Sequence, residues 1–515
     1  MADFNVPLII RGEIIEDYEM EFGDRSGAGR SFMTPDVGKY IDKLVCKRGE
    51  LLADLYTITL EDIYDYLEEL SGRLNLDTNP YWKEAFEVSC YASNLSRSVL
   101  KEQYRKTPNM LKRGNATDLV EGRIGSQYLE GWVPRKQSDG RTVNIRAMGT
   151  RSVHITAGNV PVVAVGTLLR GAVTRNDVIV KAPSNDPLTA SALARTMIDM
   201  APDHPITKHF SVAYWKGGDE KVETMIYNSR NIQKIAAWGG YDSIKHISKY
   251  LGPGLDLITM DPKNSTTLIG KEAYTDEKTT REVARRVAAD MGGLDQEACV
   301  CARVMYIESG TDKQGIERAN HFGKLVYEAL QHLPKTTSAG SRTFDPELKS
   351  ELKSISPLKD FYNVITDDID NVDKTGAVIV SQMSESVDFP MLLYGRVGNL
   401  VPLDNIEEAL SFFTAATQTV GIFPPALRKR IRDMAALRGG QMFQPVGYAI
   451  GGGMTAPQDG IEPERRMCAW VVDYDSYPEV VPAPWLELGE KGVELESDSF
   501  YKNLDAKYSA NVSTG

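Results

Sequence analysis

Cysteine is scarce in this chain, and the few that occur are not spaced for a disulfide framework or a zinc site. Only five are present in 515 residues, and no two of them form a C-x-x-C pair. So few thiols cannot cross-link a fold of this length. We therefore expect reduced cysteines and no metal site. The five are Cys46, Cys90, Cys299, Cys301 and Cys468.

Positive charge is also in deficit. Lys and Arg total 59 against 71 Asp and Glu, which gives a formal net charge of −12. The overall field therefore favours neither nucleic acid nor an anionic membrane as a partner. The apolar run from Val160 to Leu169 is about half of a membrane span, and the first residues lack a basic segment followed by an apolar core. We expect a cytoplasmic protein without a transmembrane segment.

Several common catalytic motifs are missing as well. The chain has no P-loop, no G-x-S-x-G, no H-E-x-x-H and no G-x-G-x-x-G. These absences count against a serine triad, a zinc hydrolase and an ordinary Rossmann fingerprint. The six histidines are scattered, and each is more typical of a structural or surface position than of a ligand.

What is present is the composition of a large globular protein, with 42% hydrophobic and 25% charged residues. The length is more than three times the roughly 150 residues of a common domain, so we expect two or three modules. Residues 1–127 are polar and mainly helical in pattern, and we expect them to pack on a cofactor domain. One helix is expected to begin after Thr59 and to end before Gly72, with apolar residues on one face.

A β-hairpin is indicated over residues 128–147, where polar and apolar residues alternate around Asp139-Gly140. Such an arm often pairs with another subunit. Farther along, apolar β-rich runs alternate with helical segments, which is typical of a parallel α/β architecture. The expected strands are residues 153–156, 178–181 and 232–238, and the expected helices are residues 190–200 and 242–250.

A second α/β region begins near Thr279 and continues to a strand at residues 304–307. The helix at its start has Val283, Val287 and Ala288 on one face. Residues 334–357 are rich in Ser, Thr, Lys and Pro, which favours a surface excursion. We therefore expect domains at residues 148–270 and 271–473, and a tail at residues 474–515.

Polar side chains stand where two apolar runs of the first α/β region end. Asn159 lies at a strand-to-helix break, where its amide can donate to an oxygen that gains negative charge. On spacing alone a turn asparagine is the favoured reading. Lys181 follows a buried strand, which places an ammonium at the carboxyl edge of a parallel sheet, where ligands bind. An exposed strand-end lysine is the alternative.

A glycine pair ends another apolar strand. Gly239 and Gly240 follow Trp238 and precede a helix, so a helix amino terminus without side chains could approach a pyrophosphate. The alternative is that the two glycines only make the turn.

Cys299 is the candidate nucleophile. It follows the flexible Gly292-Gly293 segment and precedes an apolar run, which could place a thiol in a cleft between modules. A buried inert thiol is the commoner fate of a single cysteine. Cys301 competes with it, because residues two apart on an extended segment face the same side.

Taken in order, these pieces resemble the aldehyde dehydrogenase superfamily, and within it the acyl-CoA reductase branch typified by the fatty-acid reductase of bacterial luminescence. The resemblance covers about Gly131 to Asp473. The matching motifs are Gly158–Pro161, Arg170-Gly171, Asn176–Ser184, Ser184–Pro187, Ala237–Gly240, Gln296–Cys299, Tyr394–Val397, Gln418–Gly421, Pro457–Gly460 and Arg466–Asp473.

The resemblance implies an α/β, aldehyde dehydrogenase-like fold with a Rossmann-type cofactor domain, an α/β catalytic domain and an oligomerisation hairpin. Cys299 matches the family nucleophile, and Asn159 with the backbone amide of Cys299 matches the oxyanion hole. The matched cofactor-binding positions point to NADPH, with NADH possible. They are Lys181, Ser184, Trp238, Gly239, Gly240 and Tyr394.

Two positions depart from the family pattern. Thr259 stands where hydrolytic aldehyde dehydrogenases carry a glutamate base, and Leu392 stands where they carry a glutamate that holds the ribose. The expected reaction is therefore reduction of an acyl-CoA or an acyl-carrier thioester to the aldehyde through acyl-Cys299, by a homodimer or homotetramer.

Two rival functions stay open. One is a hydrolytic aldehyde dehydrogenase that uses Glu297, Glu407 or another carboxylate as its base. The other is a non-redox protein that binds or transfers acyl groups.

Overall fold

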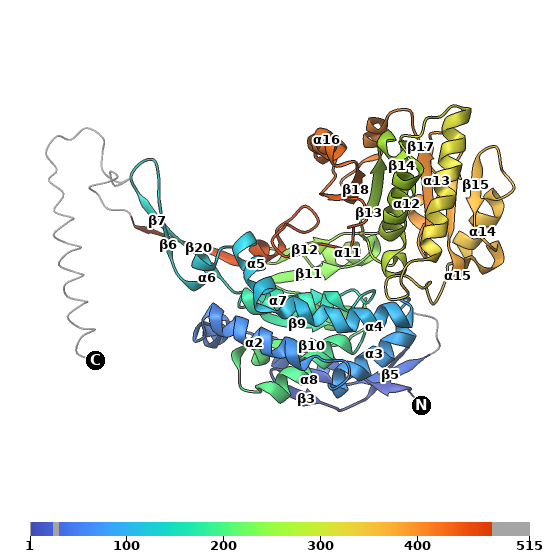
Figure 1. Ribbon diagram of the computed structural model, residues 1–515. Helices are drawn as coiled ribbons and strands as arrows, with labels where there is room; N and C mark the ends of the chain where they lie inside the picture. Colours follow the sequence, from blue (N-terminus) through green and yellow to red (C-terminus); the bar gives the residue numbers. More distant parts are fainter. Residues whose placement is uncertain (1, 24–29, 476–515) are drawn as a thin grey trace, which may run out of the picture.

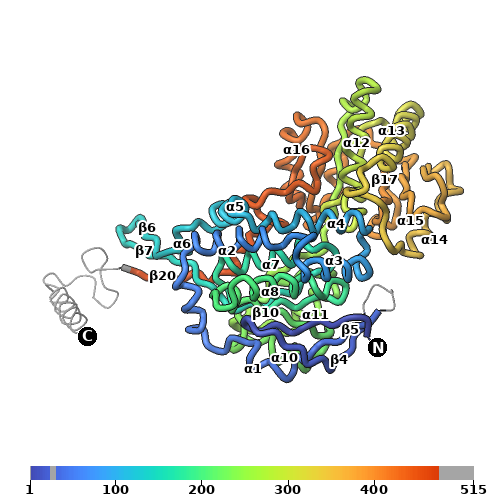
Figure 2. Tube along the Cα trace, turned by 60° about the horizontal axis from the view of Figure 1, so that its bottom comes forward, coloured from blue at the N-terminus to red at the C-terminus, as the bar shows by residue number. Residues whose placement is uncertain are grey.

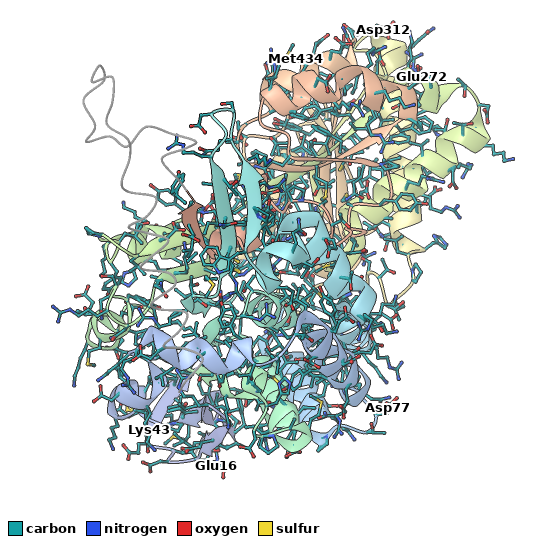
Figure 3. All side chains as sticks on the ribbon, turned by 90° about the vertical axis from the view of Figure 1, so that its left-hand side faces the viewer. Glu16, Lys43, Asp77, Glu272, Asp312 and Met434 are labelled. Atoms are coloured by element: carbon teal, nitrogen blue, oxygen red, sulfur yellow. The ribbon has the colours of Figure 1, made fainter. Side chains whose placement is uncertain are left out.

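The computed structural model describes residues 2–23 and 30–475. They form two α/β units, and a three-stranded arm projects from them (Figure 1). In Figure 3, Glu16 marks the outer end of the first unit, and Asp312 and Met434 mark the outer end of the second.

The first unit is built on a seven-stranded sheet with the order β12-β11-β8-β9-β10-β2-β3. The five strands from β12 to β10 are parallel, whereas β2 and β3 form an antiparallel hairpin at the edge. The three strands expected from the sequence are confirmed as β8, β9 and β11. The bounds are β2 (Leu8–Ile10), β3 (Glu13–Ile15), β8 (Arg151–Ile155), β9 (Asp177–Lys181), β10 (Phe210–Ala213), β11 (Lys234–Trp238) and β12 (Asp256–Met260).

Helices cover this sheet, and most of the amino-terminal region is helical as expected (Figure 2). The helix expected after Thr59 is confirmed with its capping box, but it ends at Arg73, one residue beyond Gly72. Leu74 caps it and is buried, so packing rather than the glycine determines the end. The helices are α1 (Ile41–Leu44), α2 (Leu60–Arg73), α3 (Pro80–Ala92), α4 (Arg97–Lys106), α5 (Arg113–Arg123), α6 (Ser126–Glu130), α7 (Val162–Val173), α8 (Thr189–Met200), α9 (Pro205–Lys208), α10 (Glu220–Ile226) and α11 (Tyr241–Ser248).

The amino-terminal region also contains strands that the sequence pattern did not predict. Besides β2 and β3, a small sheet has the order β1-β5-β4. These strands are two to four residues long, too short to show the alternation that identifies a strand. The bounds are β1 (Phe4–Asn5), β4 (Met20–Gly23) and β5 (Ser31–Thr34).

The second unit has its own seven-stranded sheet with the order β15-β16-β17-β14-β13-β18-β19, parallel except for β15. Its bounds are β13 (Asn264–Ile269), β14 (Ala302–Ile307), β15 (Tyr362–Ile365), β16 (Ala377–Ser381), β17 (Val397–Pro402), β18 (Thr417–Phe423) and β19 (Met442–Pro445). Its helices are α12 (Glu277–Gly292), α13 (Lys313–Gln331), α14 (Pro346–Ile355), α15 (Val372–Thr375) and α16 (Pro425–Leu437), and α17 (Pro463–Met467) follows.

Two expectations about this unit are wrong. The chain leaves the first sheet after Met260 and enters the second at Asn264, because β13 pairs with β14 and β18; a boundary at residue 270 is too late. Residues 334–357 are not only a surface excursion. Ser338 is buried, and α14 buries Leu348 and Leu352, which stand at helical i, i+4 spacing within the polar stretch.

The arm contains the expected hairpin, formed by β6 (Val133–Lys136) and β7 (Thr142–Met148) with Gly140 in the left-handed region at its turn. A third strand, β20 (Ala469–Asp475), pairs along the whole of β7. The end of the expected catalytic domain therefore belongs to the arm. Residues 476–515 of the expected tail lie outside the described residues. Within the described ranges, no helix is long and apolar enough to span a bilayer.

Candidate active site

Cys299 lies in a short irregular segment between the 3-10 helix Gly293–Gln296 and β14, and it is exposed. Ser265 Oγ, from β13, donates a hydrogen bond to the Cys299 carbonyl oxygen at 2.7 Å. The register of β13 shifts beside Ser265 against both neighbouring strands. Such irregularities change the local direction of a strand, and this one lies at the residue that bonds the Cys299 main chain.

The segment before Cys299 has an unusual backbone that buried hydrogen bonds hold. Leu294, Asp295 and Gln296 all have positive φ values, between 51° and 63°. The Gln296 amide donates to the carbonyls of Ala302 and Val397, and its oxygen accepts from Val397 N–H at 2.8 Å. Left-handed backbone costs free energy in residues with a side chain, so these contacts hold the thiol segment in one conformation.

Cys301 is placed quite differently from Cys299. It is 1% exposed, and its thiol donates to the Gly293 carbonyl at 3.0 Å. Burial raises the pKa of the Cys301 thiol far above its usual range. The expectation that the two cysteines face the same side is wrong, because residues 298–301 form turns and bends rather than extended strand. Cys299 is the accessible thiol of the pair.

Asn159 reaches the cysteine segment from the other unit. It lies in the turn between β8 and α7, and its Nδ2 donates to the Glu297 carbonyl oxygen at 3.3 Å. Its Oδ1 is buried without a hydrogen-bond partner among the described residues. The turn needs a glycine before it, because a Cβ on Gly158 would lie 2.2 Å from Asn185 Oδ1. The carboxyl edge of the first sheet therefore meets the amino edge of the second at Cys299.

Three side chains determine the electrostatic setting of the Cys299 sulfur. The residue is exposed, yet the protein around the sulfur desolvates it, and this is the main reason why the pKa of the thiol is raised. The Asp459 carboxylate raises it further, whereas a hydrogen bond from Gln418 and the charge of Arg303 lower it. The raised pKa means that the resting group at neutral pH is a thiol.

Glu297 is a carboxyl group with an unusual pKa, two residues from Cys299. Desolvation is the largest effect and raises the pKa of Glu297 to about 7. The Ser341 hydroxyl donates to Glu297 Oε1 at 3.1 Å, and Asn94 also hydrogen-bonds the side chain. Burial raises the pKa of the Tyr394 hydroxyl to about 12, and the nearby Glu297 raises it too. The Tyr394 ring stacks on Phe344.

The other expected cofactor residues gather at the carboxyl ends of the adjacent parallel strands β11, β8 and β9. The Lys181 ammonium lies 5.5 Å from the Trp215 ring and 6.0 Å from the Tyr214 ring, and Ser184 is buried. Trp238 lies under the Arg170 guanidinium at 5.6 Å. A Cβ on Gly239 would lie 3.0 Å from the Ser243 Cβ.

The glycine turn leads directly into α11. Gly240 is its N-cap, with open space around it and no side-chain cap on the helix. The first N–H groups of α11 therefore remain available to an anion, and these residues fit a dinucleotide.

The two residues that depart from the family pattern lie in a strand and on an apolar cluster. Thr259 pairs with Ala237 inside the first sheet. Leu392 packs on an apolar cluster of the second unit. Glu407 forms an exposed ion pair with Arg430 at 3.2 Å, and no contact joins it to Cys299 among the described residues.

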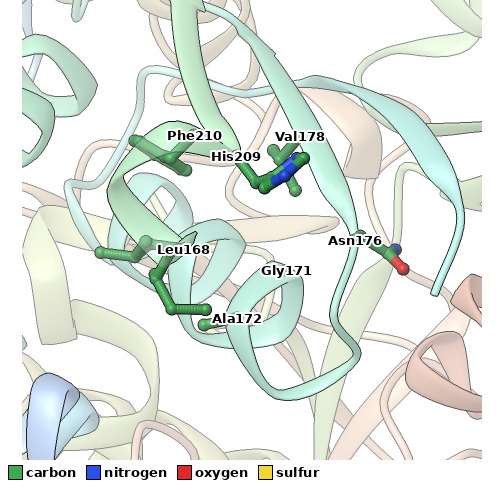
Figure 4. A pocket seen from close by; sticks show the side chains of 8 residues that line it. Leu168, Gly171, Ala172, Asn176, Val178, His209 and Phe210 are labelled. Carbon is green, nitrogen blue, oxygen red and sulfur yellow. The ribbon is translucent and has the colours of Figure 1, made fainter. Parts of the chain in front are cut away.

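Two hollows lie away from Cys299. One is a cavity of about 10 Å³ between α7, β9 and His209, large enough for about one water molecule (Figure 4). The other is an open depression of about 720 Å³ lined by Lys234, Asp256, Arg465, Trp470 and their neighbours, where β11 and β12 begin. Within the described residues, no three His, Cys, Asp or Glu side chains could hold a metal ion.

Sequence reasoning missed several residues of this site. Ser265, Asp295 and Ser341 carry no recognisable local signal, because each acts through a partner far away in the sequence. Gln418, Arg170 and Asp459 lie in motifs of the family resemblance, which was the one signal that could have drawn attention to them.

Comparison with known proteins agrees with this arrangement. The family described as "Acyl-CoA reductase (LuxC)" matches residues 55–470. A long-chain acyl-protein thioester reductase of Photorhabdus luminescens is 29% identical over 374 residues, which cover 70% of this chain and 71% of that protein. The protein of the same name in Aliivibrio fischeri is 30% identical over 361 residues, 69% of each chain.

Solved structures show the same fold. A lactaldehyde dehydrogenase superposes with a TM-score of 0.68 over 92% of this chain and 99% of its own, at 13% identity. A Mycobacterium tuberculosis aldehyde dehydrogenase in complex with NAD+ superposes with a TM-score of 0.67 over 92% and 98%, also at 13% identity. The architecture is therefore that of the aldehyde dehydrogenases, as the sequence led us to expect.

Proposed function

The chain belongs to the acyl-CoA reductase family, and we propose that it reduces an acyl thioester to the aldehyde through a covalent acyl-Cys299 intermediate, with NADPH as the reductant. The observation that carries this proposal is the position of Cys299, an exposed thiol where the two sheets meet, beside the amide of Asn159.

The first half-reaction is transthioesterification. The Cys299 sulfur forms a bond to the acyl carbon, and the bond from that carbon to the donor sulfur breaks, releasing the donor thiol. Asn159 Nδ2 and the Cys299 backbone N–H are the donors that would stabilise the oxyanion of the tetrahedral stage. Thr259 supports survival of the acyl-enzyme, because it cannot activate water as a carboxylate would.

The second half-reaction is reduction of the bound thioester. Lys181, Ser184 and the turn before α11 would hold a nicotinamide, which would supply the hydride that reduces the acyl carbon. The tetrahedral oxyanion then collapses, the bond from carbon to Cys299 breaks, and the aldehyde leaves. Asn159 would stabilise this oxyanion as well.

The acyl donor is proposed from the relatives. The proteins of Photorhabdus luminescens and Aliivibrio fischeri are named for long-chain acyl-protein thioesters, whereas the family description names acyl-CoA. We propose a long-chain acyl group carried by a protein or by CoA. Comparing kcat/KM for the same acyl chain on CoA and on a carrier protein would separate the two donors.

The reaction itself is tested without a nicotinamide. Incubation of the full chain with a long-chain acyl-CoA should release one thiol per Cys299 and leave an acyl adduct on that residue by mass spectrometry. Addition of NADPH should then convert the adduct to aldehyde. Rapid formation of free acid would instead support the hydrolytic aldehyde dehydrogenase, and failure to bind either nicotinamide would support a non-redox acyl carrier.

We also propose that the chain forms homo-oligomers through its arm. The arm projects from the first unit beside α5 and α6, and its outer strand exposes Val472 and Tyr474 (Figure 1). Light scattering after size exclusion should give a dimer or tetramer, and charged substitutions at these two positions should shift it toward the monomer.

A further inference from the structure

Besides Asn159, which bonds the main chain beside Cys299, a second carboxamide lies in the site and interacts with the Cys299 side chain itself. Gln418 lies near the start of β18, is 4% exposed, and hydrogen-bonds the Cys299 side chain. Strand β18 is the neighbour of β13, whose Ser265 holds the Cys299 carbonyl oxygen. Adjacent strands of the second sheet therefore position the main chain and the sulfur of the same residue.

The orientation of the Gln418 amide is determined by Asp459. Gln418 Nε2 donates to Asp459 Oδ1, and Gln418 Oε1 is buried without a partner among the described residues. The opposite orientation would direct Oε1 at a carboxylate oxygen, placing two acceptors together. A primary amide has two N–H donors, so Nε2 can donate to Asp459 and to Cys299 at once. This orientation costs free energy, because it leaves the Gln418 Oε1 buried without a hydrogen bond.

Asp459 is itself held in place. It has a positive φ of 52°, between Gln458 and Ile461, whose backbones exchange two hydrogen bonds of 2.9 Å. Arg170, from α7, donates to Gln458 Oε1 and to Glu464 Oε1. The same guanidinium lies over Trp238, so this loop is tied to the proposed cofactor edge.

We propose that Gln418 is a catalytic residue that donates an N–H to the Cys299 sulfur, and that Asp459 is a positioning residue that orients its amide. The assignment rests on the proposed function. When the tetrahedral oxyanion collapses, the electron pair of the breaking carbon–sulfur bond goes to sulfur, and the oxygen electrons form the aldehyde carbonyl. The Gln418 N–H stabilises the thiolate formed in this step and the attacking thiolate of the next turnover.

The negative charge of Asp459 opposes thiolate formation, whereas its hydrogen bond orients the Gln418 amide. These two effects of Asp459 on the sulfur have opposite signs and can therefore be separated. A negative charge near the sulfur disfavours the thiolate, so Asp459 helps only by orienting Gln418. The other charged or titratable groups around the sulfur are Arg303 and Cys301. Those that act on Asp459 are Lys263, Arg170 and Asp261.

The test is the pH dependence of Cys299 alkylation by iodoacetamide in the full chain without substrates, together with kcat. Gln418→Met removes the donor and should raise the pH midpoint of alkylation and lower kcat about tenfold or more. Gln418→Glu, of matched shape, should raise the midpoint further. Asp459→Asn keeps an acceptor for Gln418 but removes the charge, so it should lower the midpoint, whereas Asp459→Ala should lower kcat below that of Asp459→Asn.

An unchanged midpoint and an unchanged kcat in Gln418→Met would overturn the role of Gln418. Equal behaviour of the two Asp459 variants would overturn the positioning role. Both results would leave the acyl-Cys299 adduct intact. Absence of that adduct in the unsubstituted protein would instead contradict the proposed function. If Gln418→Met fails to fold, Gln418→Leu, which also removes the donor without adding a charge, takes its place.

Discussion

Asn159 Nδ2 donates to the main-chain oxygen of Glu297 at 3.3 Å, although the two residues are 138 positions apart. This contact joins the turn after β8, at the carboxyl edge of one sheet, to the segment that carries Cys299 at the amino edge of the other. The amide side chain of one unit is thus fixed to the segment of the other unit that carries the thiol, two residues before Cys299.

Substitution of Cys299 and substitution of Cys301 should have contrasting effects on aldehyde formation. Cys299→Ser should lower aldehyde formation by at least about 10³-fold, because the nucleophile is lost. Cys301→Ala should retain kcat within about threefold and lose about 1 kcal/mol of stability, since its buried thiol donates to a backbone carbonyl. Aldehyde formation, mass spectrometry of the acyl adduct and thermal unfolding provide the measurements. An adduct on Cys301 would contradict the assignment.

Removal of the Asn159 amide should slow both half-reactions. Asn159→Ala should lower kcat by about 10²-fold or more, because one oxyanion donor is lost at each tetrahedral stage. Stopped-flow release of the donor thiol and steady-state aldehyde formation should fall together, with no change in NADPH affinity by fluorescence titration. Asn231→Ala, far from Cys299 on the same unit, is the control. A change in KM alone would argue against the oxyanion role.

Glu297 should make stability depend on pH. Its folded pKa of about 7 lies above its ordinary value of 4.5, so the folded state binds the proton more tightly than the unfolded state. Its contribution is therefore present at low pH and is lost as pH rises through 7. The loss amounts to about 2 kcal/mol, since one pKa step is worth ~1.4 kcal/mol and solvent screens part of the effect.

Urea unfolding between pH 5 and 8 measures this dependence. Glu297→Gln should flatten the stability profile over that interval. Glu407→Gln, which alters an exposed carboxylate on the same unit, is the control and should leave the profile unchanged. An equally steep profile in Glu297→Gln would show that another group is responsible.

Asp295 should matter for stability and for activity. Its carboxylate is 0% exposed and accepts hydrogen bonds from the backbone N–H groups of Ser96 at 2.8 Å, Ala339 at 2.6 Å and Gly340 at 2.9 Å. Asp295→Ala should cost about 2–4 kcal/mol, because three buried donors lose a charged acceptor. Asp433→Ala, at an exposed site on α16, is the control. A Tm within 1 °C of the parent would contradict the prediction.

Much of the local organisation could be read in the sequence. The hairpin turn at Asp139-Gly140, the capping box at Thr59 and the strand before Lys181 follow from short-range rules, and the structure contains all three. The exact ends of helices and strands were harder to predict from the sequence, as Gly72 shows. The strands β2 and β3 could not be predicted at all, since their place at the edge of the first sheet depends on pairing with β10, some 200 residues away.

The sequence by itself determined which chemistry the chain can offer: one thiol after a glycine segment, an amide after a strand and a lysine at a strand end. Only the tertiary structure decided which of these groups meet. It turned Cys301 inward and brought Gln418 and Asp459 to the sulfur. The reason is physical: local rules act through neighbouring residues, whereas the meeting of side chains from different strands depends on sheet register and on how two cores pack together.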